Sequence, residues 1–136
     1  MTQASIANAL SIAGSDPSGG AGIQADLKSF SAHHVFGMAV ITALTAQNTC
    51  GVTDIHLPPV DFIKAQINAI FEDIRVDAVK IGMVANAGIA KAVKDALVDQ
   101  HCRHIVLDPV MVAKGGAPLL DPDAVDAVRC DLLPLA

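Results

Sequence analysis

Short aliphatic runs alternate along this chain with segments of helical period. Residues 9–13, 38–47, 78–82 and 104–107 are rich in Ala, Val, Ile and Leu and are bounded by Gly, Pro or Asp, which is typical of buried strands. A shorter strand is predicted at 52–57. Because strands that are aliphatic on both faces occur mainly in parallel sheets covered by helices, the pattern predicts an α/β fold with three layers, αβα, around a mostly parallel sheet.

Apolar residues at steps of three and four mark the predicted helices. Ile23, Leu27 and Phe30 define the first helix, which directly follows a Gly-rich segment. The later helices are each predicted with a capping residue at the start: 61–74 with Asp61; Asn86 before Ile89, Val93 and Leu97; and Asp121 before Pro122, Val125, Val128 and Leu132. The sequence therefore predicts repeated strand and helix units without an internal repeat or a linker.

The composition indicates one folded domain over residues 1–136. Hydrophobic residues make up 52% of the chain and charged residues 17%, which excludes intrinsic disorder. Trp and Tyr are absent, so aliphatic side chains must form the core. The three cysteines have no C-x-x-C spacing, and we expect reduced, mostly buried thiols.

Charge and hydropathy restrict the partners. Nine Lys and Arg against 14 Asp and Glu give a net charge of −5 without a basic cluster, so we expect no nucleic-acid or anionic-membrane surface. No apolar run approaches the roughly 18 residues that span a bilayer. No Lys or Arg precedes the first apolar stretch, as it would in a signal peptide. A cytoplasmic protein is therefore expected.

The carboxyl ends of the predicted parallel strands meet at one edge of the sheet, where ligands bind in open α/β folds. Amides, carboxylates, thioethers and glycine backbone gather there, at Gly14, Ser15, Asp16, Gln47, Asn48, Gly82, Met83, Asp108, Val110 and Met111. Because few fixed positive charges are present, this edge suits a small, flat, hydrogen-bonding heterocycle better than a multiply charged phosphate ester.

Three of the polar residues also allow a purely structural interpretation. The side-chain amide of Gln47 can form hydrogen bonds with the donor and acceptor groups on the edge of an aminopyrimidine. Alternatively, Gln47 can cap the end of the sheet. Asp26 lies early in the first helix, where favourable helix-start electrostatics would also explain it. Lys80 is more simply paired with a strand-end carboxylate than catalytic, because an unpaired buried ammonium is costly.

Spacing disfavours other kinds of site. Residues 20–25 match the G-x-G-x-x-A variant of the dinucleotide fingerprint, but the glycines begin seven residues after the strand and no acidic residue follows at about 20 positions. No Walker-type phosphate loop occurs. His101, Cys102 and His104 match no common zinc spacing, and we expect no metal site in this chain.

Four segments carry a more specific signal: AGSDPSGGAGIQADLKSFSA (13–32), VITALTAQNTCGV (40–52), DAVKIGM (77–83) and VLDPVMVAKGGAPLL (106–120). In this order and spacing they closely resemble the hydroxymethylpyrimidine/phosphomethylpyrimidine kinases of thiamine biosynthesis, which have a ribokinase-like fold. The resemblance covers essentially the whole chain. It implies phosphorylation of 4-amino-5-hydroxymethyl-2-methylpyrimidine and then of its monophosphate, with ATP and Mg²⁺ as cofactors and a homodimeric assembly.

The resemblance also implies roles for five residues. Gln47, Asp26 and the backbone of Gly14 match positions that hold the pyrimidine. Met83 and Val110 match residues that wall the ring. These positions lie mostly at the sheet edge predicted from the strand pattern.

Members of the family are roughly twice as long as this chain, and their second half supplies the adenine site and a Gly-rich anion hole with a catalytic cysteine. Cys50, Cys102 and Cys130 lie in no such loop, so we expect no catalytic residue in this chain. We therefore interpret it as the substrate-side N-terminal half of a truncated kinase domain, without kinase turnover by itself. A pyridoxine/pyridoxal kinase of the same fold and a non-catalytic pyrimidine-binding remnant are the alternatives.

Overall fold

The computed structural model describes residues 6–112, 116 and 118–136. Residues 1–5 of the N-terminal segment, and residues 113–115 and 117 of the fourth family-like motif, lie outside the described residues.

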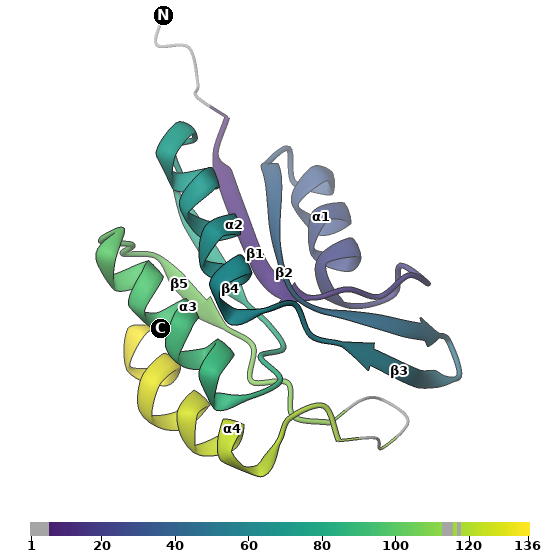
Figure 1. Cartoon of the computed structure of the whole chain (residues 1–136). Helices are drawn as coiled ribbons and strands as arrows, with labels where there is room; N and C mark the ends of the chain where they lie inside the picture. The colour runs from purple at the N-terminus through teal and green to yellow at the C-terminus, as the bar shows by residue number, and fades with distance from the viewer. Residues whose placement is uncertain (1–5, 113–115, 117) are drawn as a thin grey trace, which may run out of the picture.

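Five strands form one sheet in the order β3-β2-β1-β4-β5 (Figure 1). Their bounds are β1 Asn8–Gly14, β2 Phe36–Asn48, β3 Gly51–His56, β4 Ala78–Ile81 and β5 Ile105–Leu107. β1 pairs in parallel with β2 and β4, and β4 pairs in parallel with β5. β3 runs antiparallel to β2. The described sheet is thus mostly parallel, as the aliphatic runs predict.

Helices cover both faces of the sheet. Their bounds are α1 Gly22–Ala32, α2 Val60–Asp73, α3 Ala87–Asp99 and α4 Pro122–Ala127, and α4 continues into a π-helical turn, Val128–Leu132, and a 3-10 turn, Leu133–Leu135. Figure 1 shows α1 on one face and α2, α3 and α4 on the other. The predicted α/β fold with three layers is confirmed.

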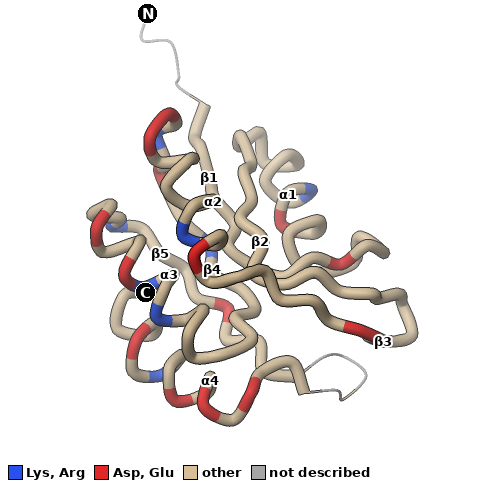
Figure 2. Tube along the Cα trace, in the orientation of Figure 1, with Lys and Arg blue, Asp and Glu red and all other residues tan. Residues whose placement is uncertain are grey.

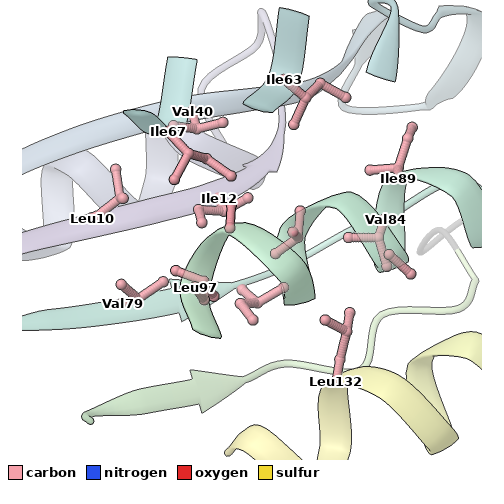
Figure 3. Packing of buried hydrophobic residues seen from close by; sticks show 14 of the residues in the cluster. Leu10, Ile12, Val40, Ile63, Ile67, Val79, Val84, Ile89, Leu97 and Leu132 are labelled. Atoms are coloured by element: carbon pink, nitrogen blue, oxygen red, sulfur yellow. The ribbon is translucent and has the colours of Figure 1, made fainter. Parts of the chain in front are cut away.

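The main core lies between the sheet and the helices α2 and α3 (Figure 3). Leu10, Ile12, Val79 and Ile81 point from the central strands into this layer, and each is at most 1% exposed. They pack with buried residues of the helices: Ile63, Ile67, Ile89, Val93, Leu97 and Leu132. Full burial of one such side chain contributes about 1.5–3 kcal/mol, so this layer supplies much of the stability of the fold.

The helix starts agree in part with the predicted caps. The side chain of Asn86 accepts a hydrogen bond from the Ile89 amide at 2.9 Å, which confirms this cap. Asp121 occupies the N-cap position before Pro122, but its side chain makes no capping bond. The prediction for Asp61 is wrong, because α2 begins one residue earlier, after Pro59, and places Asp61 in its first turn.

The antiparallel pairing of β3 was not predicted. β2 runs past the parallel part of the sheet, and its last residues form a two-stranded ribbon with β3 that projects from the sheet (Figure 1). The side chain of Asn48 accepts hydrogen bonds from the amides of Cys50 and Gly51 and so closes the turn. Gln47 and Asn48 therefore belong to this ribbon, not to the end of a parallel strand.

The prediction of mostly buried thiols is wrong for two of the three cysteines. Cys50, at the ribbon turn, and Cys130 are exposed, and Cys102 is half-buried. All three are free. Burial raises the pKa of the Cys102 thiol, although the amides of His104 and Arg103 act in the opposite direction.

Surface charge in the described chain is mixed. Figure 2 shows the basic positions spread over separate helices and strands, with acidic positions between them. No described helix is long and apolar enough to span a bilayer.

Gln66 of α2 protects the edge of β2 where β3 has not yet begun to pair. Its Oε1 accepts a hydrogen bond from the Ile41 amide at 3.0 Å, and its Nε2 donates one to the Ile41 carbonyl at 3.2 Å. The side-chain amide thus takes the place of a neighbouring strand at this residue. Both backbone groups would otherwise lose their partners beneath the helix.

Gln66→Ala is expected to lower the free energy of unfolding by about 1–3 kcal/mol, because it leaves the polar groups of Ile41 without these partners. Urea unfolding followed by circular dichroism measures this effect. Asn68→Ala, at an exposed position of the same helix, is the control and should change stability by less than about 0.5 kcal/mol. Equal stability of the two variants would contradict the role of Gln66.

Candidate functional site

A cavity of about 250 Å³ opens at the carboxyl ends of the parallel strands, beside the start of α1. It is lined by residues of all five strands or the loops that follow them and by the start of α1: Ala13, Gly14, Ser15, Ala21, Gly22, Asp26, Thr45, Gln47, Val52, Lys80, Gly82, Met83, Asp108, Val110, Val112 and Leu119. Drug-sized ligands usually occupy about 300–1,000 Å³. This cavity therefore suits a single small ring.

The position of α1 depends on a close approach between Gly22 and the end of β1. Gly22 has a φ of +57°, and a Cβ on it would collide with the carbonyl oxygen of Gly14. A side chain at position 22 would thus be strained by its backbone conformation and would also push α1 off the strand. The glycine is required for this contact and does more than permit a surface turn.

Asp16 organises the loop between β1 and α1. Its carboxylate, in a residue that is 2% exposed, accepts hydrogen bonds from the amide and hydroxyl of Ser18 and from the amide of Gly20. Its own amide donates to Gln24 Oε1 at 2.7 Å. Burial raises the pKa of Asp16, but the Ser18, Ala21 and Gly20 hydrogen bonds outweigh it and hold that pKa below the ordinary 3.8.

Ser15 and Thr45 join this loop to β2. The Thr45 amide donates to Ser15 Oγ at 3.1 Å, and the Thr45 hydroxyl donates to the Ser15 carbonyl at 2.8 Å. Thr45 Oγ1 also lies 3.1 Å from Gln47 Oε1. One hydroxyl proton cannot serve both acceptors fully. The Gln47 Nε2 group has no hydrogen-bond partner among the described residues, so it can donate to a molecule in the cavity.

The structure brings all five residues expected at the site to this one cavity. Gly14 ends β1, Asp26 comes from α1, Gln47 from the ribbon, Met83 follows β4 and Val110 follows β5. A Cβ on Gly14 would lie 2.8 Å from Met83 Cε, so the glycine allows the thioether to pack over the strand end. The binding of a pyrimidine by these residues stays a prediction.

Lys80 forms the ion pair that the sequence predicts, and a second, shorter one. Its Nζ lies 3.7 Å from the strand-end carboxylate of Asp108 and 3.0 Å from Asp26 Oδ2. Helix-start electrostatics do not explain Asp26, because α1 begins at Gly22 and no acidic residue lies in its first turn. Asp26 instead forms an ion pair with Lys80, and both residues line the cavity.

Ser11 is a residue of this site that sequence reasoning missed. Its side chain is fully buried on β1, and its hydroxyl donates to Asp26 Oδ2 at 2.6 Å. A hydroxyl between Leu10 and Ile12 was the available signal, because a buried polar side chain needs a partner. The same reasoning applies to Thr42, whose buried hydroxyl donates to the Met83 carbonyl at 2.6 Å and fixes the segment after β4.

A second cavity of about 340 Å³ lies between the loop around Asp16 and the turn of the ribbon. It shares Ala21, Gln47 and Val52 with the first cavity. Gln47 therefore lies at the boundary between the two.

Among the described residues, no three His, Cys, Asp or Glu side chains lie close enough together to hold a metal ion. Lys80 is the one cation among the described residues that line the first cavity, and it is already paired with Asp26. These residues fit a neutral ring with hydrogen-bonding groups. They do not fit a metal–triphosphate complex.

Comparison of sequences gives a consistent assignment. A family model described as phosphomethylpyrimidine kinase matches residues 16–136. The hydroxymethylpyrimidine/phosphomethylpyrimidine kinase of Salmonella typhimurium is 56% identical over 127 residues, which cover 93% of this chain and 48% of that protein. The kinase of the same name from Bacillus subtilis is 49% identical over 130 residues, with coverage of 96% and 48%. The chain spans about half the length of the curated relatives it matches.

Solved structures show the same likeness. The phosphomethylpyrimidine kinase of Clostridium difficile superposes with a TM-score of 0.90 at 51% identity, over 96% of this chain and 56% of that chain. The pyridoxal kinase of Staphylococcus aureus in complex with AMP-PCP and pyridoxal gives a TM-score of 0.83 at 33% identity, over 97% and 46%. The expected ribokinase-like α/β fold is confirmed by these likenesses.

Asp16→Asn is expected to lower the melting temperature at pH 7 by about 5 °C. The Gly20 amide now donates a hydrogen bond to the carboxylate, and in the variant it would face an NH₂ group that cannot accept one. Since the pKa of Asp16 is lowered, the ionised group stabilises the fold above about pH 4, and this stabilisation is lost as the pH falls through the lowered pKa. Thermal unfolding at pH 7 and at about pH 3 should therefore show the difference between wild type and variant shrink in acid.

Asp126→Asn is the control for this experiment, because Asp126 forms an exposed ion pair with Arg129. Exposed pairs contribute little to stability, so this variant should melt close to wild type. A wild-type advantage over Asp16→Asn that is as large in acid as at neutral pH would contradict the ionised role of Asp16.

Proposed function

The chain belongs to the phosphomethylpyrimidine kinase family, and we propose that it forms the substrate side of a kinase that phosphorylates 4-amino-5-hydroxymethyl-2-methylpyrimidine and then its monophosphate. The observation that carries this proposal is the single cavity that collects Gly14, Asp26, Gln47, Met83 and Val110. These residues come from five separate segments of the chain. The fold places them together.

The chemistry of the cavity matches such a ring. Met83 and Val110 provide apolar walls for the faces of a flat heterocycle. The Gln47 amide and the Asp26 carboxylate provide hydrogen-bonding groups for its polar edge. Phosphoryl transfer depends on positioning of the substrate and on charge neutralisation. These residues contribute to positioning, because they hold the hydroxymethyl group in one place.

MgATP supplies the phosphoryl group when bound. The described cavity residues do not fit a metal–triphosphate complex, because their one cation is paired with Asp26. We therefore propose that the nucleotide site and the catalytic base belong to the part of the family-length protein that this chain does not contain. Homodimeric assembly belongs to the same proposal and rests on the family resemblance. A cytoplasmic location also belongs to it and is an expectation from the sequence.

The chain should bind 4-amino-5-hydroxymethyl-2-methylpyrimidine in calorimetric titration, and Gln47→Leu should weaken this binding about tenfold by removing hydrogen bonds to the ring. Gln100→Leu, at the end of α3 and away from the cavity, is the matched control and should bind as wild type. Equal affinity of the two variants would exclude Gln47 from the site.

Pyridoxal is the second candidate ligand, because a structure similar to this chain is a pyridoxal kinase in complex with pyridoxal. Titration with pyridoxal under the same conditions separates the two rings. Weaker binding of pyridoxal than of the aminopyrimidine is expected, and the reverse order would favour the pyridoxal kinase.

Incubation of the purified chain with MgATP and the pyrimidine is expected to give no phosphorylated product above a no-protein control. A coupled assay for ADP, with product detection by mass spectrometry, makes the measurement. Phosphorylated pyrimidine formed in proportion to the amount of chain would refute the proposal that the catalytic groups lie elsewhere.

A further inference from the structure

Lys80 lies between two carboxylates that differ in exposure. Its Nζ is 3.0 Å from Asp26 Oδ2 and 3.7 Å from Asp108 Oδ2. The side chains of Lys80 and Asp26 are 22% and 18% exposed, whereas that of Asp108 is 54% exposed. Because solvent screens exposed pairs most, the short Lys80–Asp26 pair is the stronger of the two.

Asp26 is held through one of its two oxygens. Ser11, the register partner of Lys80 in the β1–β4 pairing, donates to the same Oδ2 at 2.6 Å. Oδ1 accepts no hydrogen bond from any described residue, although Asp26 lines the cavity. The carboxylate is thus fixed by Oδ2, and Oδ1 is available to accept a hydrogen bond from a molecule in the cavity.

The backbone leaves room for the Lys80 ammonium. A Cβ on Gly82 would lie 3.0 Å from Lys80 Nζ and 2.8 Å from Ala13 Cβ. A side chain at position 82 would therefore compete with the ammonium for space and collide with β1. Two strands and one helix together keep the ammonium beside Asp26.

We propose that Lys80 is a positioning residue that makes ligand recognition depend on an amino group. Together with Ser11 it holds Asp26 by Oδ2, so that Oδ1 faces an N–H donor on the ring. An ionised carboxylate only accepts hydrogen bonds, and it therefore binds a ligand with such a donor more tightly than one without it. The inference rests on the proposed function for the identity of the ring, and it adds the reason why the amino-substituted ring is preferred.

The test compares two ligands by calorimetric titration of the chain: 4-amino-5-hydroxymethyl-2-methylpyrimidine and the analogue that lacks the 4-amino group. Lys80→Met should weaken binding of the amino ring about 10- to 100-fold, because the Asp26 carboxylate is no longer held. The same variant should change binding of the analogue by less than about threefold, because that ring has no amino donor for Oδ1.

Two further variants make the comparison specific. Lys80→Arg keeps a cationic donor beside Asp26 and should restore most of the preference for the amino ring. Lys91→Met removes a lysine that pairs with Asp95 on the exposed side of α3, and it should bind both ligands as wild type does. Circular dichroism melting of each variant reports whether it folds.

The possible failures are distinct. A folded Lys80→Met variant that binds the amino ring like wild type, or that loses equal affinity for both ligands, overturns the positioning role alone. Loss of cooperative melting in both Lys80 variants also overturns it, because Lys80 would then be needed for folding. A folded wild-type chain that binds neither ligand overturns the proposed function and this inference together.

Discussion

The contact between α1 and the end of β1 is the one on which the rest of the site depends. Gly22, with its left-handed backbone, lets the helix begin directly against the carbonyl of Gly14. The helix then brings Asp26 over β1 and β4, within reach of Ser11 and Lys80. A helix that began farther from the strand would leave the carboxylate without its partners. It would also leave the buried Ser11 hydroxyl without an acceptor. The fold would then be less stable, and the site would lose the group that holds Asp26.

The central strand β1 meets this constraint by carrying different chemistry on its two faces. Leu10 and Ile12 point into the aliphatic layer under α2 and α3, while Ser11, between them, faces α1. Aliphatic packing positions the sheet, and one hydroxyl on the opposite face joins that sheet to a charged pair. The scaffold and the site are thus built from alternate residues of the same strand, so a shift of register by one residue would destroy both.

Much of this arrangement could be predicted from local sequence. Aliphatic runs mark the parallel strands, helical period marks α2 and α3, and Asn86 marks a helix start that the structure confirms. The direction of β3 could not be predicted in this way, because alternation along a strand does not say which way it pairs. The turn determines the direction of β3. The Asn48 side chain accepts hydrogen bonds from the amides of Cys50 and Gly51, and a connection this short can join only antiparallel strands. The exposure of Cys50 follows from that turn.

The partners of the site residues were harder to predict than the residues themselves. Asp26 and Lys80 are 54 positions apart in the chain, and nothing local to either identifies the other. Their pairing follows from the strand order, because β4 lies beside β1, and β1 is one of the strands against which α1 packs. The same strand order explains the charge of the cavity. Two carboxylates and one ammonium converge where strands β1, β4 and β5 end, and this balance favours a ring with hydrogen-bond donors over an added phosphate chain. A kinase that bound its ring substrate in this cavity would therefore neutralise its phosphates with groups outside the cavity.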